Sequence, residues 1–319
     1  MLKKIYKEIK KYDNIYIFGH IRPDGDCYGS QFGLKALIED NFHKNVHVVG
    51  DTSEYVSFLG TPEKEQITDE EIKNGLAIVV DCGAADRVSD MRYQTALKVI
   101  KIDHHIAVGE YGDLVHVEEE KPACCQIITE FALVNKMKIT ERAAFPLYVG
   151  LITDTGRFRF RGVDSKTFHA AGVLVDAGVD IELVDNLLSV EEMNVIHYKG
   201  YVFENAVFTP NGAVYIKVTD AVVQQYGLTY EEAASQVSLL GTIKGYPVFC
   251  LLIEYPTGIR IRLRSRGPRV DKLANMYEGG GHEKAAGANL NSWDDLEEFA
   301  QKLDDLVKYY KETGKDDLY

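Results

Sequence analysis

The sequence has no apolar run of about 20 residues, the length that a helix needs to cross a bilayer. Residues 1–12 also lack the apolar core of a signal peptide, because lysines alternate there with Leu2, Ile5 and Ile9. This stretch instead predicts an amphipathic helix. We therefore expect a cytoplasmic protein that has no membrane partner.

Cysteine is scarce and its spacing is uninformative for zinc or redox chemistry. The five cysteines are odd in number, include the adjacent pair Cys124 and Cys125, and never form a C-x-x-C motif. This excludes a complete disulfide framework and agrees with a reducing compartment. Cys27 and Cys82 lie beside the motifs described below. A thiolate ligand is one interpretation for them, and a small packing residue is the one we favour.

Positive charge is also in short supply. The chain has 36 Lys and Arg residues against 49 Asp and Glu residues, which gives a formal net charge of −13. A protein that grips long nucleic acid through many phosphates needs the opposite balance. We therefore exclude long duplex nucleic acid as a partner and expect a short anionic substrate held by a few local cations.

The chain is organised around the motif at residues 20–30. It follows an apolar strand at 15–18 and precedes a helical apolar pattern at 32–38, so His20, Asp24 and Asp26 fall on a strand-to-helix turn. In an open α/β sheet, this edge binds ligands. Two neighbouring carboxylates repel each other unless a cation lies between them, and a histidine beside them suits a transition metal.

Three further acidic motifs each follow an apolar segment. Asp81 follows residues 76–80, Asp103-His104-His105 follows residues 97–102, and Asp154 follows residues 147–152. Parallel strands would bring these ends to one edge of the sheet. Five aspartates and three histidines would then converge, and without a metal they would repel each other strongly.

These four motifs resemble those of the DHH phosphoesterase superfamily, which is named for the triplet found here at 103–105. Residues 279–287, Gly-Gly-Gly-His-Glu-Lys-Ala-Ala-Gly, resemble the signature of its small DHH-associated domain. Five motifs occur in the family's order along most of the chain. The length and layout are closest to the branch of oligoribonucleases and 3′-phosphoadenosine 5′-phosphate phosphatases.

The resemblance implies two manganese ions, with cobalt or magnesium as alternatives. Six side chains would bind them: His20, Asp24, Asp26, Asp81, His104 and Asp154. Asp81 would be shared by both ions, and the metals would activate a water for attack on phosphorus. His105 would contact the substrate, as a phosphate ligand or as a general acid. Asp103 would orient a histidine.

Substrate binding is expected in the second half of the chain. Arginines alternate with apolar residues from Ile259 to Arg266, and Arg264 and Ser265 match the family's arginine–serine position. The Gly279–His282 run suits an anion, because glycine lets the backbone approach it closely. The resemblance implies that Gly280, Gly281 and His282 contact the substrate. We also expect residues from Glu283 onward to begin a helix.

The predicted fold class is α/β. Strands alternate with helices up to residue 188, which predicts a mostly parallel sheet in a DHH catalytic domain at 1–188. A linker helix is expected at 189–205. Hairpins around the turns at 210–212 and 256–258 then predict a smaller α+β substrate-binding domain at 206–319.

The expected function is a two-metal phosphodiesterase that hydrolyses short single-stranded oligoribonucleotides to mononucleotides. Removal of the 3′-phosphate of 3′-phosphoadenosine 5′-phosphate is a second candidate activity. One alternative is a phosphodiesterase of linear or cyclic di-adenylate nucleotides. The other is a non-catalytic protein that binds RNA or nucleotides. A homodimer is compatible with the resemblance.

Overall fold

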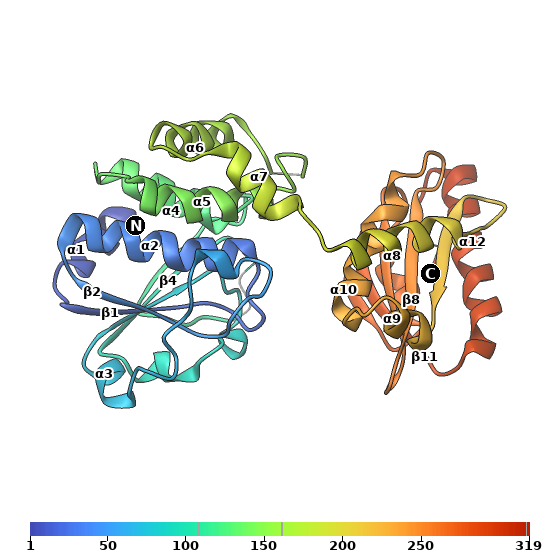
Figure 1. Ribbon diagram of the computed structural model, residues 1–319, viewed down its shortest axis with the longest axis horizontal. Coiled ribbons are helices and arrows are strands. Elements are labelled where there is room, and N and C mark those ends of the chain that lie inside the picture. Colours follow the sequence, from blue (N-terminus) through green and yellow to red (C-terminus); the bar gives the residue numbers. More distant parts are fainter. Residues whose placement is uncertain (107–108, 161, 317) are drawn as a thin grey trace. The chain divides into compact units, whose positions relative to one another are not determined.

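The computed structural model describes residues 1–106, 109–160, 162–316 and 318–319. Contacts divide the chain into two compact units, Met1–Ser189 and Val190–Tyr319 (Figure 1). None of the helices in the described residues is long and apolar enough to cross a membrane.

The first unit contains a five-stranded parallel sheet in the order β2-β1-β3-β4-β5. The strands are β1 (Asn14–Phe18), β2 (Asn45–Val49), β3 (Leu76–Val80), β4 (Lys98–Asp103) and β5 (Leu114–Val117). The predicted parallel sheet is therefore confirmed. Strand β5 was not predicted from the sequence; it is only four residues long, none of them is fully buried, and Leu114 packs against the core.

Helices pack on both faces of this sheet, and alternation along β1 explains why. Ile15 and Ile17 point to the core beneath α2 (Gly25–Phe42), α4 (Cys124–Val134) and α5 (Glu141–Asp154). Tyr16 and Phe18 point to the opposite core, which includes Ile72 of α3 (Asp69–Lys73). The remaining helices of this unit are α1 (Leu2–Ile9), α6 (Ser165–Asp176) and α7 (Ile181–Ser189).

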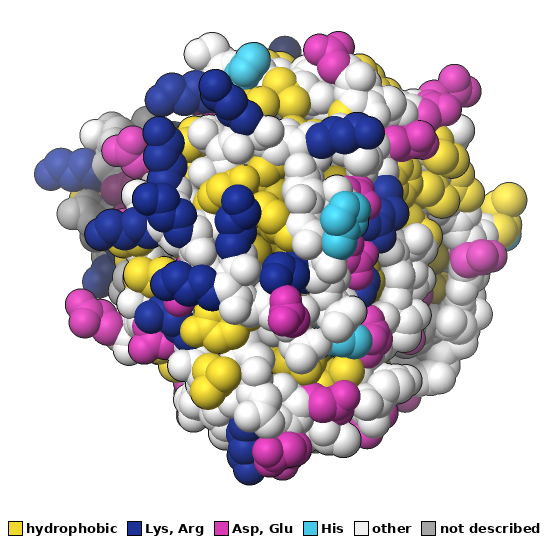
Figure 2. Space-filling view, turned by 90° about the vertical axis from the view of Figure 1, so that its left-hand side faces the viewer, with side chains coloured by type: hydrophobic (Ala, Val, Ile, Leu, Met, Phe, Trp, Pro, Cys, Tyr) yellow, Lys and Arg dark blue, Asp and Glu magenta, His cyan; other side chains and the backbone are white. Residues whose placement is uncertain are grey.

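Helix α1 confirms the predicted amphipathic helix at the N-terminus. Ile5 and Ile9 are buried in the core, whereas its lysines are exposed. Figure 2 shows Lys and Arg side chains gathered on the face of the molecule where α1 lies. The apolar side of α1 therefore packs into the core of the first unit, and its charged side remains in solvent.

Helices α2 and α5 approach each other closely along a line of glycines. A Cβ added at Gly29 would lie 2.4 Å from the carbonyl oxygen of Pro146, and one added at Gly25 would lie 2.2 Å from the Thr153 hydroxyl. One added at Gly150, on α5, would lie 3.1 Å from the Cα of Asp26. Only hydrogen at these positions permits the contact. It brings the start of α2 next to the end of α5.

The second unit contains a six-stranded sheet in the order β10-β11-β9-β8-β7-β6. Its strands are β6 (Val207–Phe208), β7 (Ala213–Val218), β8 (Val248–Tyr255), β9 (Gly258–Ser265), β10 (Gly280–His282) and β11 (Ala285–Leu290). Its helices are α8 (Met193–Glu204), α9 (Asp220–Gln225), α10 (Tyr230–Ser235), α11 (Asp271–Asn275) and α12 (Leu296–Thr313). Both predicted hairpins, β6–β7 and β8–β9, are antiparallel pairs.

Helix α8 covers most of the stretch expected to be a linker. Its Tyr198 and Val202 are fully buried in one core of the second unit, together with Val214 and Leu251. The helix is therefore part of the second unit, because its apolar side completes that core.

Candidate active site

The predicted acidic motifs of the first unit lie at the carboxyl edge of the parallel sheet. His20 follows β1, Asp81 follows β3, and Asp103 ends β4. Two helix ends complete the cluster: Asp24 and Asp26 at the start of α2, and Asp154 at the end of α5. The structure thus brings the predicted metal-site residues of the first unit together.

His104 lies at the centre of one group of ligand atoms. Its Nε2 is 3.8 Å from Asp26 Oδ2, 3.3 Å from Asp81 Oδ1 and 3.4 Å from Asp154 Oδ2. Its Nδ1 lies 3.0 Å from the carbonyl oxygen of Lys121. Since a carbonyl only accepts, Nδ1 carries the hydrogen, and Nε2 is the atom offered to the carboxylates.

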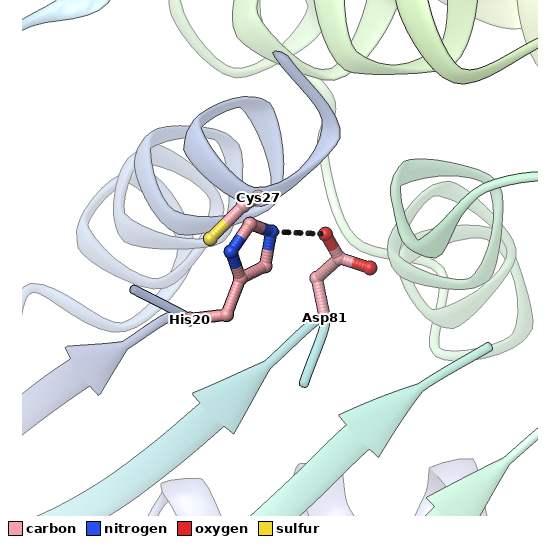
Figure 3. A group of neighbouring side chains, drawn as sticks. All are labelled: His20, Cys27 and Asp81. Atoms are coloured by element: carbon pink, nitrogen blue, oxygen red, sulfur yellow. Dashed lines mark ion pairs between the residues drawn. The ribbon is translucent and has the colours of Figure 1, made fainter. Parts of the chain in front are cut away.

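His20 is the centre of a second group, which shares Asp81 with the first. Its Nε2 is 3.8 Å from Asp24 Oδ1 and 3.6 Å from Asp81 Oδ2. Its Nδ1 donates to the carbonyl of Ile21 at 2.9 Å, so Nε2 again faces the carboxylates. Figure 3 shows the His20 ring directed at Asp81, with Cys27 of α2 beside the ring.

Cys27 has the surroundings of a packing residue. Its side chain is fully buried, and its sulfur would be only 2.3 Å from a Cβ at Gly19. Its ligand atom nevertheless lies within 4.8 Å of those of His20 and Asp81. A larger residue at 27 would therefore displace the turn that carries His20.

Asp81 is the most constrained residue of the cluster. It is 1% exposed, its φ of 54° is in the left-handed region, and its Oδ1 has no hydrogen-bond partner among the described residues. A non-glycine residue in this region costs about 1–3 kcal/mol and is typical of functional sites. The unpaired oxygen faces His104 Nε2, so a proton or a cation is needed between two acceptors.

Crowding of the carboxylates changes their proton affinity. Burial and the charge of Asp81 raise the pKa of Asp26 to about 7. Burial, Asp26 and Asp81 raise the pKa of Asp154 to about 8. Burial lowers the pKa of His104, but its contacts with Asp81, Asp26 and Asp154 outweigh this and raise the pKa to about 10. Without a cation, the cluster therefore retains protons near neutral pH.

Asp26 is positioned by the N-terminus of α4. Its two carboxylate oxygens accept hydrogen bonds from the backbone N–H groups of Cys124, at 2.6 Å, and of Cys125, at 2.9 Å. A helix N-terminus favours a carboxylate, because its first N–H groups lack partners within the helix. The sequence contained no signal for this contact, since 98 residues separate the partners.

Asp103 connects His105 to a buried lysine. Asp103 Oδ1 lies 2.8 Å from His105 Nδ1 and also accepts the backbone N–H of His104 and His105. Its Oδ2 lies 3.2 Å from the ammonium of Lys101, which donates to the Gly83 carbonyl at 3.0 Å. The His105 side chain is 47% exposed, so its Nε2 remains available to a ligand.

The candidate residues of the second unit share one row of its sheet. His282 of β10 is paired with Ala285 of β11, and Ala285 is paired with Arg264 of β9. Residues paired across adjacent strands project to the same face. Ser265 is 9% exposed, and its hydroxyl accepts the N–H of Gly267 at 3.0 Å. Gly280 and Gly281 belong to β10 beside His282.

The helix expected from Glu283 onward is wrong. A turn at residues 283–284 connects β10 to β11, which pairs with β9 from Ala285 to Leu290. The Ala-Ala-Gly run is compatible with a helix start locally, but pairing along a full neighbouring strand decides the conformation.

The donor set fits divalent metal ions. Three groups of side chains place their ligand atoms within 4.8 Å of one another: His20, Cys27 and Asp81; Asp81, His104 and His105; and Asp26, His104 and Asp154. These groups combine carboxylate oxygen with imidazole nitrogen, a set that suits transition metals. The unpaired Asp81 Oδ1 is the atom for which such an ion would provide a partner.

Comparisons with known proteins agree with this geometry. Residues 14–151 match the DHH family, N-terminal domain, and residues 213–309 match the DHHA1 domain. The bifunctional oligoribonuclease and PAP phosphatase NrnA of Bacillus subtilis is 34% identical over 315 residues, which cover 98% of this chain and 100% of that protein. The probable bifunctional oligoribonuclease and PAP phosphatase NrnA of Streptococcus mutans is 36% identical over 308 residues, or 96% and 99% of the two chains.

One solved structure shares the fold over nearly the full length. An exopolyphosphatase-related protein from Bacteroides fragilis superposes with a TM-score of 0.85 at 22% identity, covering 98% of this chain and 96% of that chain. At this identity the likeness shows the fold alone. With both domain matches and the near full-length relatives, the chain belongs to the DHH family and carries a DHHA1 domain in its second unit.

Proposed function

We propose that this protein is a metal-dependent phosphoesterase that hydrolyses very short oligoribonucleotides to mononucleotides and removes the 3′-phosphate of 3′-phosphoadenosine 5′-phosphate. The observation that carries the proposal is the convergence of two histidine–carboxylate groups on the shared Asp81. The NrnA relatives are named for both activities, and they match this chain over nearly its whole length.

The residues proposed to hold the metals are His20, Asp24, Asp26, Asp81, His104 and Asp154. Together with Asp103, the site contains five carboxylates, and the buried Lys101 ammonium offsets one of their charges. The remaining four negative charges would be neutralised by two divalent cations. We propose manganese, because mixed nitrogen and oxygen ligands favour it over magnesium. When bound, such ions supply Lewis acidity and an activated water for hydrolysis of a phosphate ester.

His105 is proposed as the general acid. Its hydrogen bond to Asp103, opposed only in part by burial, raises the pKa of His105. His105 donates its Nδ1 hydrogen to Asp103, so the proton available for transfer is the one on Nε2. Because the side chain is half exposed, Nε2 can approach the leaving oxygen of a substrate and donate this proton to it.

Substrate binding in the second unit is proposed for Arg264, Ser265, His282 and the glycines Gly280 and Gly281. Arg264 and His282 share one face of the sheet, as their register requires. A guanidinium binds phosphate oxygens in a fixed geometry, which suits an anionic substrate. A cytoplasmic location is also proposed, because all five cysteines are free and buried.

The deciding experiment compares the purified protein with an Asp81→Ala variant in the presence of manganese. The substrates are the dinucleotide pApA, a long RNA, 3′-phosphoadenosine 5′-phosphate and cyclic di-AMP. We expect fast turnover of pApA and of 3′-phosphoadenosine 5′-phosphate, lost in the variant. Exclusive turnover of cyclic di-AMP would indicate a signalling-nucleotide phosphodiesterase instead. No turnover of any substrate by metal-loaded protein would contradict the proposal.

A further inference from the structure

A cavity of about 280 Å³ adjoins the candidate metal cluster within the first unit. Asp24 and Asp154 form part of its wall, so it opens directly onto the proposed reaction site. The rest of the wall includes Tyr55, Gly156, Arg157 and Arg159, which have no role in the function proposed above. Its volume is near the lower limit of small-molecule sites, about 300–1,000 Å³, which suits one nucleotide unit.

The backbone beside this cavity is strained. Gly156, Arg157 and Phe158 all have positive φ, between 53° and 61°, and the run begins two residues after Asp154. For the two non-glycine residues this conformation is unfavourable, because the Cβ lies too close to the following carbonyl oxygen. The turn sends two arginines, separated by one residue in sequence, to different surroundings.

The two arginines differ in their partners. Arg157 forms an ion pair with Asp185 and donates to the Ser189 hydroxyl at 2.6 Å, so its charge is neutralised by α7. Arg159 donates only its Nε, to the Gly156 carbonyl at 2.7 Å, and has no ion pair among the described residues. The terminal nitrogens of Arg159 therefore remain available for an anion at the wall of the cavity. Arg161, the next arginine of this alternation, lies outside the described residues.

Tyr55 adds an aromatic surface to the same wall. The residue is 57% exposed although it lies among residues that form a cavity. Any of the four bases can stack on an exposed aromatic ring, because every base has a π-face. A cation and an aromatic ring around a cavity of this size together match the phosphate and the base of a nucleotide.

We propose that this cavity is a nucleotide subsite, in which Arg159 binds the phosphate of one nucleotide unit and Tyr55 stacks on its base. The class of ligand rests on the proposed function, because a short oligonucleotide must place a neighbouring nucleotide beside the reacting phosphate. The carboxylates Asp24 and Asp154 face the same cavity, so the anion binds there when cations neutralise them.

The test uses the full chain with manganese and a reporter, bis(p-nitrophenyl) phosphate, that carries no nucleobase. AMP and ribose 5-phosphate are added as competitors, and the inhibition constant of each is measured. We expect Arg159→Gln to raise both constants about tenfold, as for a lost charge-assisted contact. Tyr55→Leu should raise the constant for AMP about fivefold or more and leave that for ribose 5-phosphate within twofold.

Arg157→Gln is the matched control, because its charge is already paired, and both constants should stay within twofold of the wild type. The assignment would be overturned if Arg159→Gln left both inhibition constants unchanged, or if Arg157→Gln raised them as much as Arg159→Gln does. So would equal weakening of both competitors by Tyr55→Leu. If the wild type hydrolyses the reporter but not pApA, the proposed function fails while these constants still decide the subsite. If the reporter is not hydrolysed, calorimetric titration with the same two ligands replaces the inhibition constants.

Discussion

The ammonium of Lys101 lies 3.2 Å from the carboxylate of Asp103, and both side chains are buried in the first unit. Lys101 also donates to the Gly83 carbonyl and lies 4.4 Å from the centre of the Tyr111 ring. Tyr111 in turn donates to the carbonyl of Cys82. Lys101 thus connects the loop after Asp81 to the aspartate that holds His105.

Replacing Lys101 by methionine should therefore destabilise the first unit. The substitution leaves Asp103 buried without its cation, a change that costs about 3–5 kcal/mol. Urea unfolding measures it. Lys98→Met, on the same strand but partly exposed, is the matched control and should change stability by less than about 0.5 kcal/mol. Equal stability of the two variants would contradict this role of Lys101.

Substitution of Gly29 by alanine should weaken metal binding from a distance. The new methyl would meet the Pro146 carbonyl at 2.4 Å and push α2 away from α5, which separates Asp26 from Asp154. We expect a loss of about 1–3 kcal/mol in stability and weaker manganese binding in calorimetry. Gly172→Ala on α6 is the control, because nothing lies within 4 Å of its Cβ. It should be neutral or stabilise by up to about 1 kcal/mol.

The metal-free protein should lose stability as the pH rises from 6 to 9. Asp26 and Asp154, with pKa values raised to about 7 and 8, hold protons that the unfolded chain has released above about pH 4. The raised pKa of His104 acts in the same direction, because its contribution is present at low pH and is lost as the pH rises.

Thermal unfolding at pH 6, 7.5 and 9, with EDTA or with manganese, measures this effect. The melting temperature in EDTA should fall by about 2–4 °C for each kcal/mol of stability lost. Manganese should stabilise the protein most at high pH, where protons no longer compete with the metal for its ligands. Asp154→Asn should flatten the dependence. A melting temperature in EDTA that rises with pH would show that the cluster does not hold these protons.

His104 and His105 should differ in what their loss removes. His104→Gln should lower the manganese content of the purified protein, because its Nε2 faces three carboxylates. His105→Gln should keep the metal but lower kcat about 10²–10⁴-fold, as for loss of a general acid. Elemental analysis and turnover of pApA on the same samples separate the two effects. Loss of metal in His105→Gln would move that residue into the metal site.

The arginines of β9 provide a matched test of the second unit. Arg264→Gln should raise KM for pApA about tenfold or more, since a charge-assisted phosphate contact is lost. Arg262 pairs with Glu231 at 2.8 Å, and Arg260 lies over the Tyr255 ring, so glutamine at those positions should change KM by less than threefold. If all three variants raise KM equally, the effect is general electrostatics and not a specific contact at Arg264.

Much of the first unit could be predicted from local pattern. Apolar strands followed by Asp or His place those residues at one edge of a parallel sheet, whatever the details of packing. The same reasoning located the hairpins of the second unit from their turn residues. It failed after His282, where pairing with β9 overrides the local preference.

The amino-acid pattern therefore specified which side chains reach the edge of the sheet, because alternation and strand ends are local properties of the chain. Packing between distant segments decided how those side chains are held. The N-terminus of α4 binds Asp26, glycines bring α2 to α5, Lys101 neutralises Asp103, and a left-handed turn separates Arg157 from Arg159. Each of these depends on close contacts or backbone angles that arise only when the whole unit folds, so no local sequence pattern predicts them.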